Sequence, residues 1–238
     1  MPFRTLDPAM ILATAERLEQ RIAERFPDRG LTKVAREVVG LSRTVAAEVK
    51  TLEPPIWGLR ILIGLVVLAG AAVFLWVGSV IPLNQVGRAA IGSVETFEAA
   101  INTLLLAALG ILALVRLEAR VKGRRVARGL HALRSVIHVI DMHQLTKDPV
   151  ALSPDFAPTA TSPRRDMDAV ALSRYLDYCS ELLAITGKLA ALYAQAVPEE
   201  GVASAVNDIE VLGASLSRKI WQKITLIEAK PAARRKRD

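Results

Sequence analysis

The sequence predicts an all-α integral membrane protein with a two-helix transmembrane hairpin and helical regions on the cytoplasmic side. Three observations support this class. Two long segments lack charge, apolar residues recur at helical spacing elsewhere, and no segment alternates apolar and polar residues for more than a few positions. The composition agrees, because 52% of the 238 residues are hydrophobic and the mean hydropathy is +0.31. This apolar content is concentrated in the two uncharged segments.

Residues 1–55 are expected to form an N-terminal cytoplasmic hairpin of two helices. Asp7 followed by Pro8 is a favourable N-cap and first-position pair, and the residues PDRG at 27–30 predict the turn between the helices. The apolar stripe of the first helix consists of Ile11, Ala15, Leu18, Ile22 and Phe26.

The second helix of this hairpin carries a heptad seam, and Pro54 and Pro55 end the helix. Glu48 occupies one position of the seam. Such a seam predicts a coiled coil, either within the hairpin or with another copy, so we expect self-association through residues 31–52. The seam residues are Leu31, Val34, Val38, Leu41, Val45 and Leu52.

The first uncharged segment runs from Ile61 to Leu83. As a helix it would be about 34 Å long, enough to cross a hydrocarbon core of about 30 Å. Trp57 and Trp76 lie near its ends, where tryptophan favours the membrane interface. We therefore expect a transmembrane helix over about 60–83.

The second uncharged segment begins at Ala99 and meets its first charge at Arg116. Ser93 is a suitable N-cap, which lets the helix begin earlier and gives a second span over about 95–117. The two spans and a short external loop form a membrane domain at 56–117. The alternative is a buried helical hairpin in a soluble domain, but such long uncharged runs favour membrane spans.

The distribution of cations predicts the orientation of the two spans. The connection between them, residues 84–98, has one cation, Arg88, whereas cations are numerous at the other ends. Because Lys and Arg remain on the cytoplasmic side, both termini should be cytoplasmic. We expect the basic band that follows the second span to contact anionic lipid, and favour lipid over nucleic acid. The predicted interface residues are Trp57, Arg60, Trp76, Arg116, Arg120, Lys122, Arg124 and Arg125.

Residues 118–229 are expected to form a cytoplasmic three-helix bundle. A loop rich in Pro, Ser and Thr at 146–166 separates the first two helices, and Asp166 or Asp168 should cap the second. Gly123 and Gly129 predict a bend where the first helix leaves the membrane. The basic tail at 230–238 is expected to be disordered.

The three histidines lie in one stretch, and two of them are weak candidates for a metal site. On a helix, His131, His138 and Asp141 share a face, whereas His143 lies about 140° away. His131 and His138 are about 10.5 Å apart along the axis, too far to bind one zinc ion. We therefore expect no metal or cofactor, and interpret these side chains as partly buried and hydrogen-bonded to Asp141 or to a neighbouring helix.

The residues HALRS at 131–135 resemble the phosphoacceptor box of sensor histidine kinases, which lies on a helix of a dimeric bundle. That resemblance would make His131 a phosphate acceptor. Ala132 stands where the box has an acidic residue, and no Gly-rich ATP-binding sequence follows. The resemblance covers five residues and does not predict phosphotransfer.

Other candidates for chemistry have simpler structural interpretations. Asp177 and Glu181 are four residues apart, and we expect them to be solvated or ion-paired with basic residues such as Arg174. Cys179 lies on an apolar stripe, where packing explains it better than nucleophilic reactivity. No catalytic residues are assigned.

The sequence therefore favours a non-enzymatic scaffold or assembly protein of the bacterial inner membrane that forms homo-oligomers. Two alternatives stay open. One is a pH- or metal-responsive signalling element that uses His131, His138 and Asp141. The other is a subunit of an oligomeric channel or transporter, for which Asn102 is the clear polar group within the spans.

Overall fold

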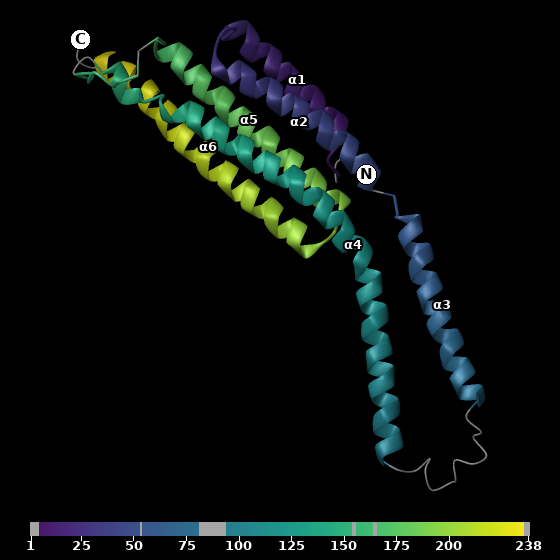
Figure 1. Ribbon diagram of the computed structural model, residues 1–238. Helices are drawn as coiled ribbons and strands as arrows, with labels where there is room; N and C mark the ends of the chain where they lie inside the picture. The colour runs from purple at the N-terminus through teal and green to yellow at the C-terminus, as the bar shows by residue number, and fades with distance from the viewer. Residues whose placement is uncertain (1–4, 53, 81–93, 154–155, 164–165, 236–238) are drawn as a thin grey trace. The chain divides into compact units, whose positions relative to one another are not determined.

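The computed structural model is helical throughout most of the residues that it describes, which are 5–52, 54–80, 94–153, 156–163 and 166–235 (Figure 1). These residues contain no strand, so the all-α prediction is confirmed. The elements are α1 (Pro8–Arg25), α2 (Gly30–Leu52), α3 (Trp57–Val80), α4 (Val94–Leu145), the 3-10 helix η1 (Pro149–Leu152), α5 (Ala169–Ala196) and α6 (Glu200–Arg235).

The chain divides into two compact units. Unit 1 combines Met1–Glu53 with Gly123–Asp238, and unit 2 is Pro54–Lys122. The predicted N-terminal hairpin and C-terminal bundle both belong to unit 1, where α1 and α2 pack against α5. The physical reason is that the apolar stripes of two short helices find more partners on a third helix than on each other alone.

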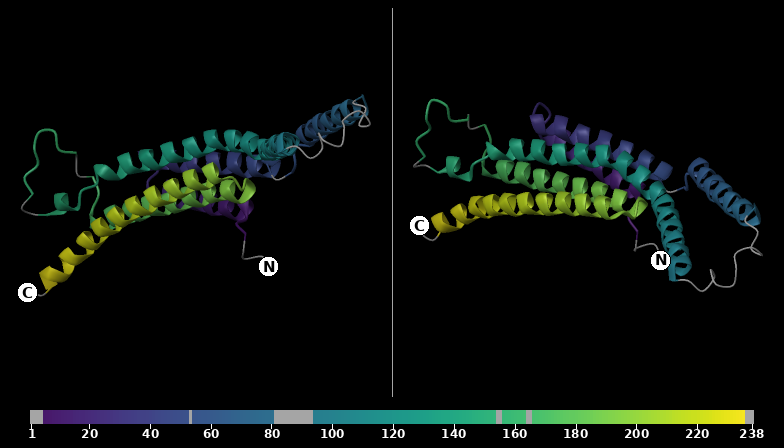
Figure 2. Two further views of the ribbon diagram at one scale, coloured as in Figure 1. Left: turned by 90° about the horizontal axis from the view of Figure 1, so that it is seen from below. Right: turned by 60° about the horizontal axis from the view of Figure 1, so that its bottom comes forward.

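Unit 1 is a helical bundle around one core. Two further views agree that α1 lies beside α2 and that α5 lies beside α6 (Figure 2). The predicted stripe of α1 is buried, and its N-cap is confirmed because Asp7 accepts a hydrogen bond of 2.8 Å from the Ala9 N–H. Asp168 similarly caps α5 by accepting from the Ala171 N–H at 2.7 Å, whereas Asp166 pairs with Arg29.

The heptad seam of α2 is buried within unit 1. Val38 is 1% exposed, and of the predicted seam residues only Leu41 and Glu48 are partly exposed. Glu48 accepts a hydrogen bond from the hydroxyl of Tyr193 on α5, which explains an acid in an apolar seam. The seam is therefore occupied by the chain's own helices.

Helix α4 is helical through both Gly123 and Gly129. Gly129 has a packing role, because a Cβ atom there would lie 2.6 Å from Cζ of Tyr193 and closer still to its hydroxyl oxygen. The absence of a side chain lets the buried Tyr193 ring lie directly on the α4 backbone. The glycine thus permits a close helix contact.

Three predicted segments differ from the structure. Helix α3 begins at Trp57 rather than near 60, while residues 81–83 of the first span and the expected N-cap Ser93 lie outside the described residues. The 146–166 segment contains η1, whose Pro149 is buried. Helix α6 continues to Arg235, so residues 230–235 of the basic tail are helical rather than disordered.

Candidate membrane-interaction site

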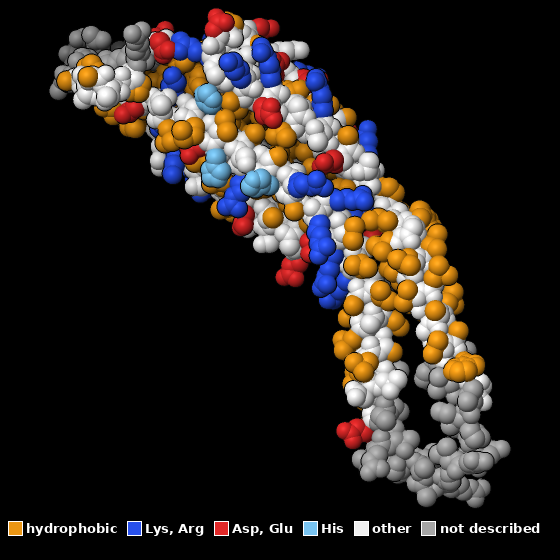
Figure 3. Space-filling model, in the orientation of Figure 1, with side chains coloured by type: hydrophobic (Ala, Val, Ile, Leu, Met, Phe, Trp, Pro, Cys, Tyr) orange, Lys and Arg blue, Asp and Glu red, His pale blue; other side chains and the backbone are white. Residues whose placement is uncertain are grey.

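Unit 2 leaves its large apolar side chains on its surface (Figure 3). On α3, Leu65 is 59% exposed and Leu68 is 68% exposed, and on the first part of α4, Leu106 is 64% exposed. The other exposed apolar residues of this unit include Ile61, Leu62, Val66, Val67, Val73, Ile101, Leu105, Leu109, Ile111, Leu112 and Leu117. Soluble proteins rarely expose an apolar surface of this extent.

By length and composition, one helical stretch within the described part of the chain could cross a membrane. The candidate runs over Gly30–Val73, which covers α2 and most of α3, and its apolar 18-residue window has a mean hydropathy of 2.2 with no residue buried. Burial distinguishes this window from the helices of unit 1, which cover their apolar stripes.

A polar cluster joins the beginning of α3 to α4 inside unit 2. The Glu118 carboxylate accepts hydrogen bonds from Arg60 Nε at 2.9 Å and from the Ile56 N–H at 3.1 Å. Lys122 Nζ lies 3.2 Å from Glu118 Oε1 and donates to the Pro54 carbonyl oxygen at 3.0 Å. We call these five residues the Glu118 clamp.

The clamp favours the ionised form of Glu118. The hydrogen bond from Arg60, followed by the one from Ile56, lowers the pKa of Glu118 from 4.5 to about 2. The clamp therefore stays intact at any neutral or mildly acidic pH.

The predicted basic band separates into two groups. Arg60 and Lys122 are engaged by Glu118, and the side chain of Lys122 is only 12% exposed. The other cations of the band are exposed, as are Trp57 and Trp76. The exposed cations are Arg116, Arg120, Arg124 and Arg125, followed by Arg128.

The structure does not bring the predicted histidine face together as a metal site. His131 and His138 are exposed, rather than partly buried as predicted, and Asp141 instead accepts a hydrogen bond of 2.6 Å from Gln144 Nε2. Among the residues that the structure describes, no three His, Cys, Asp or Glu side chains are placed to hold a metal ion. The helical period correctly placed His131 and His138 on one face of α4, but this face points away from the core.

His143, which the helical period excluded from that face, is the histidine with a structural role. A Cβ on Gly30 would lie 3.2 Å from His143 Nδ1 and closer still to Cε1, so the imidazole packs on the start of α2. Burial, with a smaller contribution from Lys147, lowers the pKa of His143. Nearby, Lys223 of α6 donates to the Gln144 carbonyl oxygen at 2.8 Å and neutralises the C-terminal end of α4. Sequence periodicity carries no signal for either contact.

The other candidates for chemistry are ion-paired or buried. Asp177 pairs with Arg174 at 2.9 Å, and Glu181 pairs with Arg21 of α1 at 2.5 Å. The two carboxylates therefore have separate basic partners. Cys179 is fully buried, and burial raises the pKa of its thiol to about 12, which disfavours the reactive thiolate.

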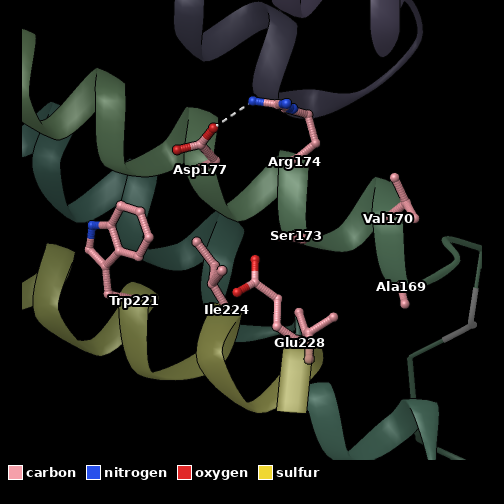
Figure 4. A pocket seen from close by; sticks show the side chains of 9 residues that line it. Ala169, Val170, Ser173, Arg174, Asp177, Trp221, Ile224 and Glu228 are labelled. Atoms are coloured by element: carbon pink, nitrogen blue, oxygen red, sulfur yellow. Dashed lines mark hydrogen bonds and ion pairs between the residues drawn. The ribbon is translucent and has the colours of Figure 1, made fainter. Parts of the chain in front are cut away.

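An open groove of about 390 Å³ lies between the start of α5 and the later part of α6 (Figure 4). Ile224 and Ile227 form an apolar floor, while Trp221 is 55% exposed at the edge. The Arg174–Asp177 ion pair lies on the α5 side, and Glu228 stands on the α6 side. Such a surface can accept an apolar side chain of a partner, and an exposed tryptophan is a common anchor of interfaces.

Comparisons of the chain with protein-family models, with curated proteins and with solved structures find no match.

Proposed function

We propose that this protein is a non-enzymatic, membrane-anchored scaffold or assembly protein. In this proposal, α3 and the first part of α4 cross the bilayer as a hairpin, and unit 1 is the cytoplasmic interaction module. The inner membrane of a bacterium is the proposed location, with both termini in the cytoplasm.

The observation that carries the proposal is the exposed apolar surface of unit 2. Leu62, Leu65 and Leu68 are each more than half exposed, and several apolar side chains on α4 are similar. Leaving one such side chain in water rather than burying it costs about 1.5–3 kcal/mol. A whole unit of exposed apolar helices is stable only in an apolar solvent, and a bilayer supplies one.

The Glu118 clamp supports a hairpin rather than two unrelated helices. Glu118 follows the second apolar segment directly, while Ile56 and Arg60 precede or begin the first. The clamp thus holds the charged ends of both segments together. Because cations remain on the cytoplasmic side, the clamp and the cations beside it would face the cytoplasm.

The scaffold role is supported by the surface of unit 1. The groove beside Trp221 is open, and Met142 and Val170 are 66% and 73% exposed. The described carboxylates at 177 and 181 are paired with arginines, and the thiol of Cys179 is buried. These features suit binding of other proteins better than catalysis.

Membrane fractionation of the full chain at native expression tests the proposal. We expect the protein in the pellet after ultracentrifugation and alkaline carbonate extraction, and in solution only after detergent is added. Recovery in the aqueous fraction without detergent would contradict membrane anchoring.

Labelling with a membrane-impermeant maleimide tests the orientation. The chain has one native cysteine, Cys179, which is buried and serves as the unlabelled background. We expect Ser93→Cys, in the proposed external connection, to react in intact cells and Asp238→Cys to react only after permeabilisation. Labelling of Asp238→Cys in intact cells would reverse the topology.

A further inference from the structure

The surface first expected to mediate self-association is not free. Val38 and Val45 of the α2 seam are each 1% exposed, because α1 and α5 cover them. A second copy would therefore need another surface of unit 1.

The outer face of α4 in unit 1 is a continuous basic surface. Between residues 119 and 140 the sequence has no Asp or Glu. The five side chains of this surface, which we call the α4 basic face, are all exposed and span about 21 Å along the helix. They are Arg124, Arg128, His131, Arg134 and His138. Histidines and basic side chains are visible together on this side of the bundle (Figure 3).

The outer face of α6 has the opposite charge. From residue 199 to residue 217 the sequence contains four acids and no Lys or Arg. Glu200 and Asp208 are exposed and lie about 80° apart around the helix, and Val211, which is 57% exposed, lies between them. We call these three residues the α6 acidic face. Glu210 lies on the other flank of α6, beside Gly187 of α5.

These charges differ from the charges elsewhere in unit 1. Arginines of α1, α2 and α5 form ion pairs with acids of the same unit, such as Arg43 with Glu16 and Arg21 with Glu181. In the part of the chain that the structure describes, no ion pair involves the α4 basic face or the α6 acidic face. Each face therefore has unneutralised charge of one sign.

The two faces lie at the same level of the bundle. A Cβ on Gly123 would contact Val202, Gly213 lies beside Ile137, and Lys223 bonds to Gln144. Residue numbers rise together in these contacts, so α4 and α6 run in the same direction with matched register. Arg128 is consequently level with the α6 turn that precedes Asp208.

We infer that the protein forms a two-fold dimer in which the α4 basic face of each copy contacts the α6 acidic face of the other. The inference rests on the proposed membrane anchoring, because two copies in one membrane share an orientation. A two-fold axis that runs along α4 and α6 keeps the levels of both copies equal, so opposite charges meet twice. An exchange of this kind neutralises both faces at once.

Charge complementarity favours a second copy of the chain over a nucleic acid or an anionic lipid surface as the partner. A nucleic acid or a lipid surface would match the α4 basic face but would leave the α6 acidic face unpaired. Residues 123–145 also contain no Phe, Tyr or Trp on which a base could stack. The second copy accounts for both faces.

A charge-swap experiment on the full chain in neutral detergent tests the dimer. Arg128→Glu and Asp208→Arg should each raise the dimer dissociation constant at least tenfold in sedimentation equilibrium. The double variant restores opposite charges and should return within threefold of the original value. Lys33→Glu is the matched control, because Lys33 is exposed on α2, away from both faces, and it should leave the dimer unchanged.

Crosslinking in native membranes gives an independent readout. Two differently tagged copies carry Ser135→Cys on α4 and Ala214→Cys on α6, both exposed and at the same level. A short bismaleimide should join the two tags. Ala47→Cys on α2 replaces Ser135→Cys in the control pair, which should give no product.

Several outcomes would overturn the dimer. A monomeric wild type, or a double variant as weak as the single variants, contradicts the charge exchange. Loss of binding to phosphatidylglycerol vesicles in Arg128→Glu with dimerisation intact would assign the α4 basic face to lipid instead. Membrane fractionation distinguishes failure of the dimer from failure of the anchoring. A monomer in the carbonate-resistant pellet would refute the dimer and leave membrane anchoring intact. A protein outside the pellet would refute membrane anchoring.

Discussion

Unit 1 and unit 2 are both built from apolar helices, yet they place the apolar side chains in opposite positions. Leu176 and Ile137 of unit 1 are fully buried, whereas Leu65 and Leu106 of unit 2 are 59% and 64% exposed. The sequence reason is the angular distribution of charge. Charged residues accompany each apolar stripe in α1, α2 and α6, but residues 61–80 of α3 contain none. An amphipathic helix can bury its apolar stripe against neighbouring helices, whereas a helix that is apolar all round requires apolar surroundings on every side.

The polar groups of the two units are also arranged differently. In unit 1 the buried hydroxyls of Ser42 and Thr186 donate to carbonyl oxygens one turn earlier in their own helices. In unit 2 the described ion pairs gather at the Glu118 clamp, at one end of the apolar segments. The polar groups of unit 1 therefore complete a core, whereas the ion-paired groups of unit 2 lie at one end of its apolar segments.

Introducing charge into α3 should have the largest effect, which is a loss of protein from the membrane pellet. Leu65→Arg together with Leu68→Arg should disfavour membrane insertion by about 6 kcal/mol, because each arginine near the centre of a span costs about 3 kcal/mol. We expect the variant to leave the carbonate-resistant pellet. The matched control is Val211→Arg with Leu226→Arg on α6, where the original side chains are 57% and 55% exposed. A control that leaves the pellet as completely would show that exposure in unit 2 has no special meaning.

Truncating one leucine in each unit should give a large effect in only one of them. Leu176→Ala removes a fully buried side chain and should lower the free energy of unfolding by about 2–5 kcal/mol. Leu65→Ala removes an exposed side chain and should change it by less than about 0.5 kcal/mol. Urea titration of the full chain in neutral detergent, followed by circular dichroism, measures both. Equal losses would mean that Leu65 packs against protein.

The sequence predicted well whatever depends on local periodicity. Asp7 was identified as a cap and Asp168 as one of two candidate caps from their positions before apolar stripes, and the α1 stripe is buried as expected. These features require only the helical repeat and the chemistry of capping. The same repeat separated His143 from His131 and His138 correctly.

The sequence could not predict which helix each stripe would contact. Periodicity defines a face but not its partner, so the α2 seam was expected to mediate self-association although α1 and α5 cover it. The contacts of Glu48 and Gly129 with Tyr193 could not be predicted for the same reason, because Tyr193 is distant in sequence from both residues. The Glu118 clamp likewise joins residues about sixty positions apart.

Two glycine substitutions should distinguish a packed from an open helix surface within unit 1 by the sign of their effect on stability. Gly129→Ala should lower the free energy of unfolding by about 1–3 kcal/mol, because its Cβ would overlap the buried Tyr193 side chain. Gly40→Ala should raise it by about 0.5–1 kcal/mol, because nothing lies within 4 Å and alanine favours the helix. Thermal unfolding of the two variants measures effects of opposite sign. A stabilised Gly129→Ala variant would contradict the close approach of α4 and α5.

The smallest expected effect concerns pH and the Glu118 clamp at the boundary of unit 2. The pKa of Glu118 is about 2 in the folded protein and 4.5 without its partners, so the clamp contributes fully above pH 4.5. Its contribution is lost as the pH falls toward 2, because protonation then removes the charge that Arg60 and Lys122 contact. Glu118→Gln should therefore be less stable than wild type at pH 6, by up to about 1 kcal/mol for an ion pair near the surface.

Thermal unfolding in detergent between about pH 2.5 and pH 6 follows this difference. We expect the gap between the wild type and Glu118→Gln to shrink as the pH falls below 4.5, because the unfolded wild type then binds a proton at Glu118 that the folded protein disfavours. Glu37→Gln changes an exposed acid of unit 1 and should track the wild type at every pH. A gap between wild type and Glu118→Gln that stays constant down to the lowest pH would mean that the carboxylate acts through its shape alone. In that case unit 2 would be bounded by packing, as unit 1 is, and not by charge.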